Sequence, residues 1–230
     1  LKIEYVTHLG DDLLVANAAR KSFNNDYTEF SFVPRTPRGR SDDELIYSLA
    51  EDGHWLPFRH PHITVSCEEA LPIARQLGKH QIGLEWSEIS RRYKTKDIKF
   101  TYLDGQWRYD VKDRRQGSGG LMSDDLQQKM AVIQARNITN CLNDYKEALR
   151  LCAAPEQARY LLPQSMNAEW TWTGSLLSFA HLYKQRNHKD AQKEVRDFAI
   201  EVSKIMTKLY PVSWFALTGV EFKKGEQHGS

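Results

Sequence analysis

Hydrophobic and polar side chains alternate in the first part of the chain and recur at helical spacing in the second. Alternation over residues 2–8 and 62–68 predicts two strands, because successive side chains of a strand point to opposite faces. Residues 91–100 and 102–111 read as a strand pair or as extended segments, with an Asp-Gly turn between them. The strands are therefore expected mostly in the N-terminal half.

Apolar residues three and four positions apart predict the helices, which dominate the C-terminal half. Ser41 and Glu44 have capping-box spacing, so a helix is expected from there to about Gly53. The helices expected overall cover residues 12–23, 41–53, 71–80, 123–153, 155–162, 174–185 and 190–210. Residues 24–40 are expected to be a loop, and 113–120 a mobile one. Early strands and late helices predict an α+β fold, with one domain over 1–220 and a polar tail over 221–230.

Composition narrows the class of protein. The 32 basic and 30 acidic residues leave a formal charge of +2, too small for a protein that coats nucleic acid. The three cysteines, Cys67, Cys141 and Cys152, form no metal-binding or disulfide pattern, so we expect no metal site and a cytoplasmic protein. No apolar run approaches the ~20 residues that span a bilayer, so no membrane association is expected.

The segment from Ala74 to Tyr93 concentrates cations, amides, hydroxyls and carboxylates in twenty residues. Arginines and hydroxyls suit a phosphate, whereas a carboxylate among them would repel a bare polyphosphate. The ligand expected is therefore a phosphate joined to a sugar or ring, as in a nucleotide. The alternative for any such charge run is a solvated helix and strand on the surface.

The order of residues in this segment resembles the signature of the flavin-dependent thymidylate synthases. That signature is Arg-His-Arg followed by Asn-Glu-x-Ser-x-Arg-Tyr, and this chain reads Lys79-His80-Gln81 and then Ser87-Glu88-Ile89-Ser90-Arg91-Arg92-Tyr93. Both flanking arginines and the asparagine are replaced, and one extra residue lies between the two parts. Lys-His-Gln with the longer spacing resembles the phage-type members of the family.

Three further segments resemble the family in the same order along the chain. Phe58-Arg59-His60 matches a Phe-Glu-His whose histidine contacts flavin, with Arg59 in place of the acid. Ala158-Arg159 through Pro163 matches Ala-Arg-x-x-Leu-Pro, whose arginine binds nucleotide. Trp172-Thr173 through Arg186 to Gln192 keeps the family spacing, with Ser175 and His181 at flavin positions and Leu177 where an arginine often stands. Taken alone, His60 reads as structural, Arg159 as a surface residue and Arg186 as a helix-end arginine.

The resemblance covers about residues 1–218 and implies reductive methylation of dUMP at C5. FAD, reduced by NADPH, would handle the hydride and methylenetetrahydrofolate would supply the carbon. The resemblance also implies a homotetramer with sites between subunits, and no nucleic-acid polymer as partner. The implied catalytic group is Arg186, which would stabilise negative charge on the uracil ring. The residues implied to bind dUMP are Gln76, Lys79, Glu88, Ser90, Arg91, Arg92, Arg159 and Arg186. Those implied to bind FAD are His60, Lys79, His80, Gln81, Glu88, Ser175 and His181.

Two other functions remain open from the residues. A related enzyme would act on the same C5 carbon but release another pyrimidine, such as a hydroxymethyl nucleotide. A non-enzymatic RNA- or nucleotide-binding module would use the cations and aromatics between Arg91 and Phe100. For either enzyme, Ser90 is expected to bind the ligand and not to attack it, because the sequence places no base beside it.

Overall fold

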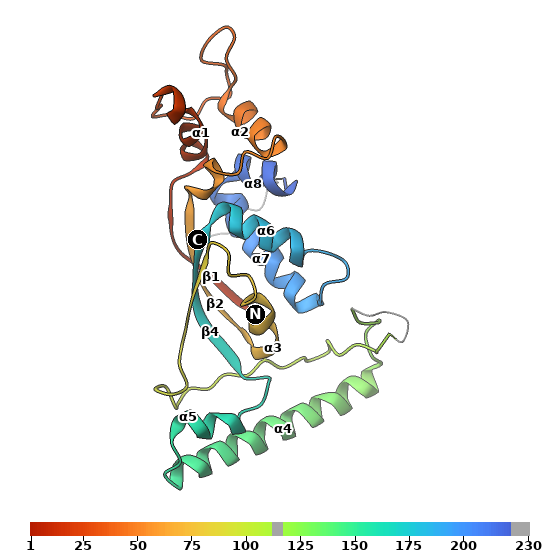
Figure 1. Ribbon diagram of the computed structural model, residues 1–230. Helices are drawn as coiled ribbons and strands as arrows, with labels where there is room; N and C mark the ends of the chain where they lie inside the picture. The colour runs from red at the N-terminus through yellow and green to blue at the C-terminus, as the bar shows by residue number, and fades with distance from the viewer. Residues whose placement is uncertain (112–116, 222–230) are drawn as a thin grey trace.

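A computed structural model describes residues 1–111 and 117–221 of the chain. These residues form one α+β domain, a small antiparallel sheet with helices on one side and a long helix set apart from them (Figure 1), which confirms the expected fold class. Half of the loop expected over 113–120 and all but one residue of the tail expected over 221–230 lie outside the described residues.

The sheet has four antiparallel strands in the order β1-β2-β4-β3. Its strands are β1 (Lys2–Leu9), β2 (His62–Ala70), β4 (Asn167–Ser175) and β3 (Leu84–Glu88). On the covered face, Val65 of β2 and Trp86 of β3 both lie opposite Trp172 of β4. Both strands expected from alternation, over 2–8 and 62–68, are present. Alternate residues of β2 from Ile63 onward are buried, whereas β1 is exposed apart from the partly buried Ile3.

The strand pair expected over 91–111 is wrong. Within the described residues, this segment makes only two isolated bridges, Phe100 with Met166 and Arg108 with Leu121. The edge of β4 is occupied instead by β3, which buries Leu84 and partly buries Trp86. The segment after β3 is rich in lysines and offers few side chains that a sheet could bury, so it does not join the sheet.

The helices around the sheet, except the last, begin close to their expected positions. They are α1 (Asp12–Arg20), α2 (Asp42–Glu51), α3 (Leu71–Leu77), α6 (Leu176–Arg186), α7 (Lys193–Leu209) and α8 (Pro211–Thr218). The Ser41–Glu44 capping box forms at the start of α2. Helix α8 was not expected, because Pro211 was read as the end of a helix, although proline is equally suited to the first turn of a new one.

An aromatic core joins the sheet to the helices that cover it. The rings of Trp86 and Trp170 stack with centroids 4.1 Å apart, and Trp172 meets Phe179 of α6 edge to face. Phe198 of α7 stacks on Trp170 from the other side. These rings contribute much of the buried apolar area and fix the helices over one face of the sheet.

Helix α4 (Asp124–Arg150) forms an arm beside this body (Figure 1). Its C-terminal half packs against α5 (Pro155–Ala158) and the 3₁₀ turn Arg159–Leu161 through a small second core that includes Tyr145 and Leu162. The arm therefore holds the α5 segment, and with it Arg159, at one end of the sheet.

Candidate functional site

One group of predicted ligand residues meets where α3 and α6 end. The guanidinium of Arg186, the last residue of α6, donates from Nε to His80 Nε2 (2.8 Å) and from Nη2 to the carbonyl oxygen of Gln76 (3.2 Å). The side chain of Gln76 donates to Gln192 Oε1 (2.5 Å). The structure thus brings together Gln76, His80 and Arg186, which the sequence had assigned to two ligands. Lys79 lies beside them, exposed, at the end of α3.

The electrostatics of this group keep His80 neutral. Partial burial and then the neighbouring positive charge of Arg186 lower the pKa of His80 to about 4. Near neutral pH the imidazole is therefore an uncharged acceptor for Arg186. A neutral histidine beside a fixed guanidinium is suited to orienting the cation and not to donating a proton from Nε2.

A second group lies at the end of the sheet where α6 begins. His62 of β2 pairs with Ser175 of β4, and the Ser175 N–H donates to the carbonyl of Gly83 (3.3 Å). This pairing brings His60, just before β2, and Gln81, just before β3, to the same end of the sheet; both are exposed. His181 follows in α6, with its ring against Trp55 (centroids 6.4 Å apart). Burial, then Lys184 and Arg59, lower the pKa of His181.

Ser175 has a structural contact that the sequence did not indicate. Its hydroxyl caps α6 by accepting from the Ser178 N–H (3.2 Å) and lies 2.8 Å from Ser178 Oγ, and only 5% of Ser175 is exposed. Gly83 has φ of +68°, and a Cβ there would come within 2.4 Å of Ser178 Oγ. The close approach of β3 to α6 therefore requires glycine.

A third group lies at the far end of β3, next to α5. Arg92 forms an ion pair with Glu156 (3.1 Å), and Arg159 donates to the backbone carbonyl of the same Glu156 (3.1 Å). Ser90 Oγ accepts from the Arg92 N–H (3.3 Å). Both arginine side chains belong to exposed residues, so this end of the sheet presents two cations and a hydroxyl that fit a phosphate. Exposed Glu88 precedes them on β3, where its carboxylate accepts from the Trp86 indole (3.2 Å).

Arg91 differs from its neighbour Arg92. It is only 6% exposed, and its guanidinium donates to the carbonyls of Lys94 (3.4 Å) and Lys96 (3.1 Å) and pairs with Glu169 (3.6 Å). These contacts hold the turn that follows Ser90. The assignment of Arg91 to dUMP remains a prediction, and its guanidinium is turned toward its own loop.

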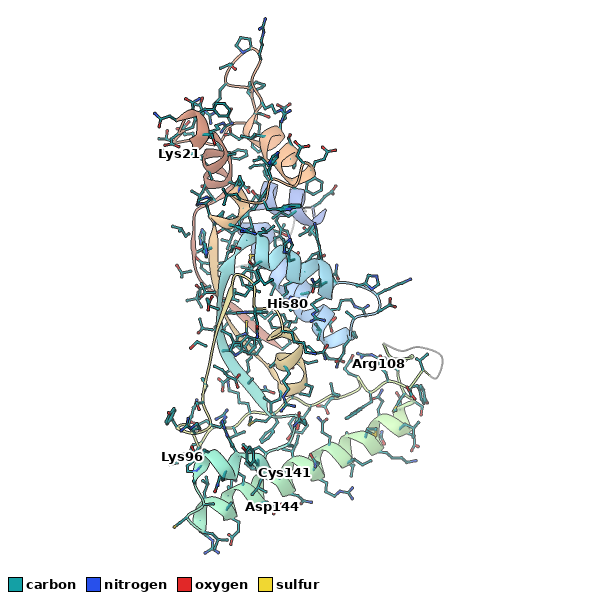
Figure 2. The ribbon with its side chains drawn as sticks, in the orientation of Figure 1. Lys21, His80, Lys96, Arg108, Cys141 and Asp144 are labelled. Atoms are coloured by element: carbon teal, nitrogen blue, oxygen red, sulfur yellow. The ribbon has the colours of Figure 1, made fainter. Side chains whose placement is uncertain are left out.

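The groups at the two ends of β3 are separated within one chain. Leu84 pairs with Gly174, near the start of α6, and Glu88 pairs with Trp170, toward α5. Four strand steps place these ends roughly 13 Å apart. Figure 2 shows the same separation, with His80 beside α6 and α7 and Lys96 beside α5. One chain therefore presents the two halves of the predicted site at different places.

Several residues that complete these groups were missed by the sequence reasoning. Glu156 pairs with Arg92 and Glu169 pairs with Arg91, and each acid lies far from its arginine in the sequence. No local sequence pattern predicts these ion pairs, because the folding of the chain brings the arginine and the glutamate together. In the sequence, Gln192 belonged only to a segment that resembles the family. In the structure, its side chain accepts a hydrogen bond from Gln76 and so lies next to the first group.

A cavity of about 500 Å³ lies beside the first group, between the body and the segment leading to the arm. Its apolar side includes Ile73 and Leu103, and its polar side includes Gln192 and the Arg108–Glu194 ion pair (2.9 Å). Within residues 1–111 and 117–221, no group of three or more histidine, cysteine or acidic side chains could hold a metal ion. In the same ranges, every helix is too short or too polar to cross a bilayer.

The donors at the α6 end of the sheet fit a flavin in their chemistry. FAD presents ring carbonyls and two unprotonated ring nitrogens that accept hydrogen bonds, and a pyrophosphate that attracts cations. His60, Lys79 and Gln81 are exposed there with donor groups, and His181 lies in α6 with part of its ring outside the core. The buried Ser175 hydroxyl is the least accessible member of the predicted set.

Comparisons with known proteins identify the family. Residues 4–212 match the family described as "Thymidylate synthase complementing protein". A flavin-dependent thymidylate synthase of Thermosipho africanus is 30% identical over 97% of this chain and 96% of its own length. One of Kosmotoga olearia is 32% identical over 94% and 92%.

Solved structures show the same fold. A UMP/dUMP methylase, PolB, from Streptomyces cacaoi with bound 5-Br dUMP superposes with a TM-score of 0.82 at 24% identity, over 95% of this chain and 94% of that one. The same enzyme with 5-Br UMP gives 0.81 at 25% identity. The family match spans most of the chain, and two relatives are at least 30% identical over nearly all of it. This chain belongs to the flavin-dependent thymidylate synthase family.

Proposed function

We propose that this protein is a flavin-dependent thymidylate synthase that methylates dUMP at C5 to give dTMP. The flavin, FAD, is reduced by NADPH and supplies the hydride, and methylenetetrahydrofolate supplies the carbon. The observation that carries the proposal is the meeting of Gln76, His80 and Arg186, three residues from separate motifs, at one place in a chain of this family.

Arg186 is the catalytic group in this proposal. Its guanidinium is positively charged at any physiological pH and would stabilise negative charge that develops on the uracil ring. That stabilisation raises the nucleophilicity of C5 without a covalent bond to the protein. Ser90, Arg92 and Arg159, at the other end of β3, would bind the nucleotide phosphate.

The separation of the two groups supports a site shared between copies of the chain. Arg186 contacts His80, which precedes β3 in the chain, whereas Arg92 and Arg159 lie beyond the other end of β3, next to α5. A second copy would bring one group opposite the other. We propose a homotetramer in which each site takes residues from different subunits.

Purified protein tests the function directly. It should show flavin absorbance, and it should oxidise NADPH in the presence of methylenetetrahydrofolate and dUMP. Mass spectrometry should identify the product as dTMP. The variant Arg186→Lys should fold and keep its flavin but turn over slowly, because the lysine ammonium lacks the planar set of N–H donors of a guanidinium. A hydroxymethyl product would favour the related C5 enzyme instead.

Two further measurements test the alternative functions. UMP should be compared with dUMP, because the structural neighbour is described as a methylase of both nucleotides. A colourless protein that binds polynucleotides with strong salt dependence would point to the binding module and overturn the enzyme proposal.

A further inference from the structure

Arg186 is held along one edge of its guanidinium. Nε–H donates to His80 Nε2, and Nη2 donates to the Gln76 carbonyl. The guanidinium has five N–H groups in a plane, and these two donors lie on the same side of it. Within the described residues, these are the hydrogen bonds that Arg186 donates, so the terminal edge, with one N–H from each Nη, remains for a ligand.

The contact also defines the tautomer of His80. Because a guanidinium does not lose its proton, His80 Nε2 must be the acceptor, and the imidazole proton must lie on Nδ1. The pKa of about 4 agrees with this state at neutral pH. Nε2 is therefore engaged by Arg186, and the group that His80 can offer to a flavin is Nδ1–H.

We propose that His80 is a positioning residue for Arg186. With the Gln76 carbonyl, it fixes the guanidinium so that the terminal edge faces the pyrimidine. An arginine at a helix end has many rotamers, and fixing one of them removes the entropy cost of orienting the cation during the reaction. The inference rests on the proposed function, because it gives His80 a role within the proposed pyrimidine site.

Two substitutions separate positioning from packing. In His80→Gln, the amide oxygen can reach the place of Nε2 and accept from Arg186, whereas His80→Leu keeps bulk without an acceptor. We expect His80→Leu to lower kcat about 100-fold with little change in the KM for dUMP, as for a misplaced catalytic group. His80→Gln should recover most of kcat, and the surface variant His54→Leu should match the wild type.

Two kinetic results would overturn the role. One is an unchanged kcat in His80→Leu. The other is a His80→Gln variant as slow as His80→Leu while both keep flavin and thermal stability, since that would require the imidazole itself. If His80→Leu does not fold, His80→Gln alone is the test. A kcat near that of the wild type in His80→Gln supports the positioning role, and a kcat far below it overturns the role.

Nitrogen-15 NMR of the wild type tests the geometry without activity. We expect the Nδ1–H tautomer for His80 at pH 7 and a slowly exchanging Nε–H signal for Arg186 that shifts in His80→Gln. An Nε2–H tautomer overturns the inference whether or not the enzyme turns over. A protein that shows both NMR signals but no dUMP-dependent turnover would overturn the proposed function and, with it, the positioning role. The hydrogen bond between Arg186 and His80 would still be established.

Discussion

At the scale of single residues, the fold gives different roles to side chains of the same type. Arg91 and Arg92 are neighbours in the sequence, yet Arg91 is buried against backbone carbonyls and Glu169, while Arg92 is exposed and paired with Glu156. Sequence reasoning assigned both to the nucleotide, because it could not see which guanidinium had internal partners. A charged residue is identified as a ligand only when its hydrogen bonds are known.

Ser90 is predicted to bind nucleotide and not to act as the nucleophile. Its hydroxyl accepts from the Arg92 N–H, a contact that does not remove its proton, and an unassisted hydroxyl is a poor nucleophile. Ser90→Ala should therefore raise the KM for dUMP about tenfold, the cost of one hydrogen bond to a charged group, and keep measurable turnover. Steady-state kinetics and dUMP titration check this. Complete loss of turnover with normal dUMP affinity would contradict it.

His80 should give the protein a characteristic dependence of stability on pH. Burial and the charge of Arg186 lower its pKa from 6.5 to about 4 in the folded state. As the pH falls from 6.5 to 4, the unfolded chain takes up a proton that the folded chain does not, so stability should fall across this window and the loss should level off below it. Urea unfolding at several pH values should show this slope in the wild type and a shallower one in His80→Gln. Equal slopes would show that His80 titrates normally.

At the scale of elements, short edge strands and the segments after them were the least predictable parts. The Asp-Gly turn within 91–111 suggested a strand pair, but the edge of β4 was taken by β3, whose five residues are too few for a periodic signal. The turn at 90–97 is instead held by Arg91 from within and by the Tyr145 hydroxyl of α4, which donates to the Thr95 carbonyl (3.4 Å). The capped helix α2 and the long helix α4 were predicted nearly to their ends.

Arg91 is expected to order this turn and, through it, Ser90 and Arg92. Arg91→Ala removes donors from two backbone carbonyls and leaves Glu169 with one cation fewer, so it should lower the free energy of unfolding by about 2 kcal/mol. The KM for dUMP should rise more than kcat falls. Lys94→Ala, an exposed change in the same turn, is the matched control. Thermal unfolding and kinetics measure both effects, and a variant with normal stability would show that the turn holds without Arg91.

At the scale of the whole molecule, the two ends of the described chain are tied together. The carboxylate of Asp12, in the first turn of α1, accepts from the N–H groups of Val212 (2.9 Å) and Ser213 (2.8 Å) at the start of α8. Tyr210, which precedes α8, has no carboxylate to do this, so a residue 200 positions away caps the helix. No local pattern could have predicted that pair.

Asp12→Ala should therefore destabilise the fold as a whole. Two buried N–H groups would lose their acceptor, which costs about 2 to 4 kcal/mol in total. The measurement is the urea midpoint, with Asp104→Ala in an exposed turn as control. A midpoint equal to that of the control would show that water or a neighbouring group replaces the carboxylate.

The proposed sharing of sites between subunits makes a prediction about mixed assemblies. Arg159→Ala and Arg186→Ala should each be nearly inactive. If a site takes Arg159 and Arg186 from different copies, then unfolding and refolding the two variants together should restore measurable activity, because some sites receive both intact arginines. Activity of the mixture equal to the mean of the separate variants would mean that both residues act within one chain.

The sequence by itself determined the fold class, most helices, two of the strands and the family, because these depend on local periodicity, caps and motifs whose residues are near one another. The tertiary structure alone decided the pairing of β3 with β4, the burial of Arg91 and the contact between His80 and Arg186, which lie 106 positions apart. Each of these depends on which surfaces meet when the chain packs. Packing brings together residues that are far apart along the chain, and no local sequence pattern predicts such contacts.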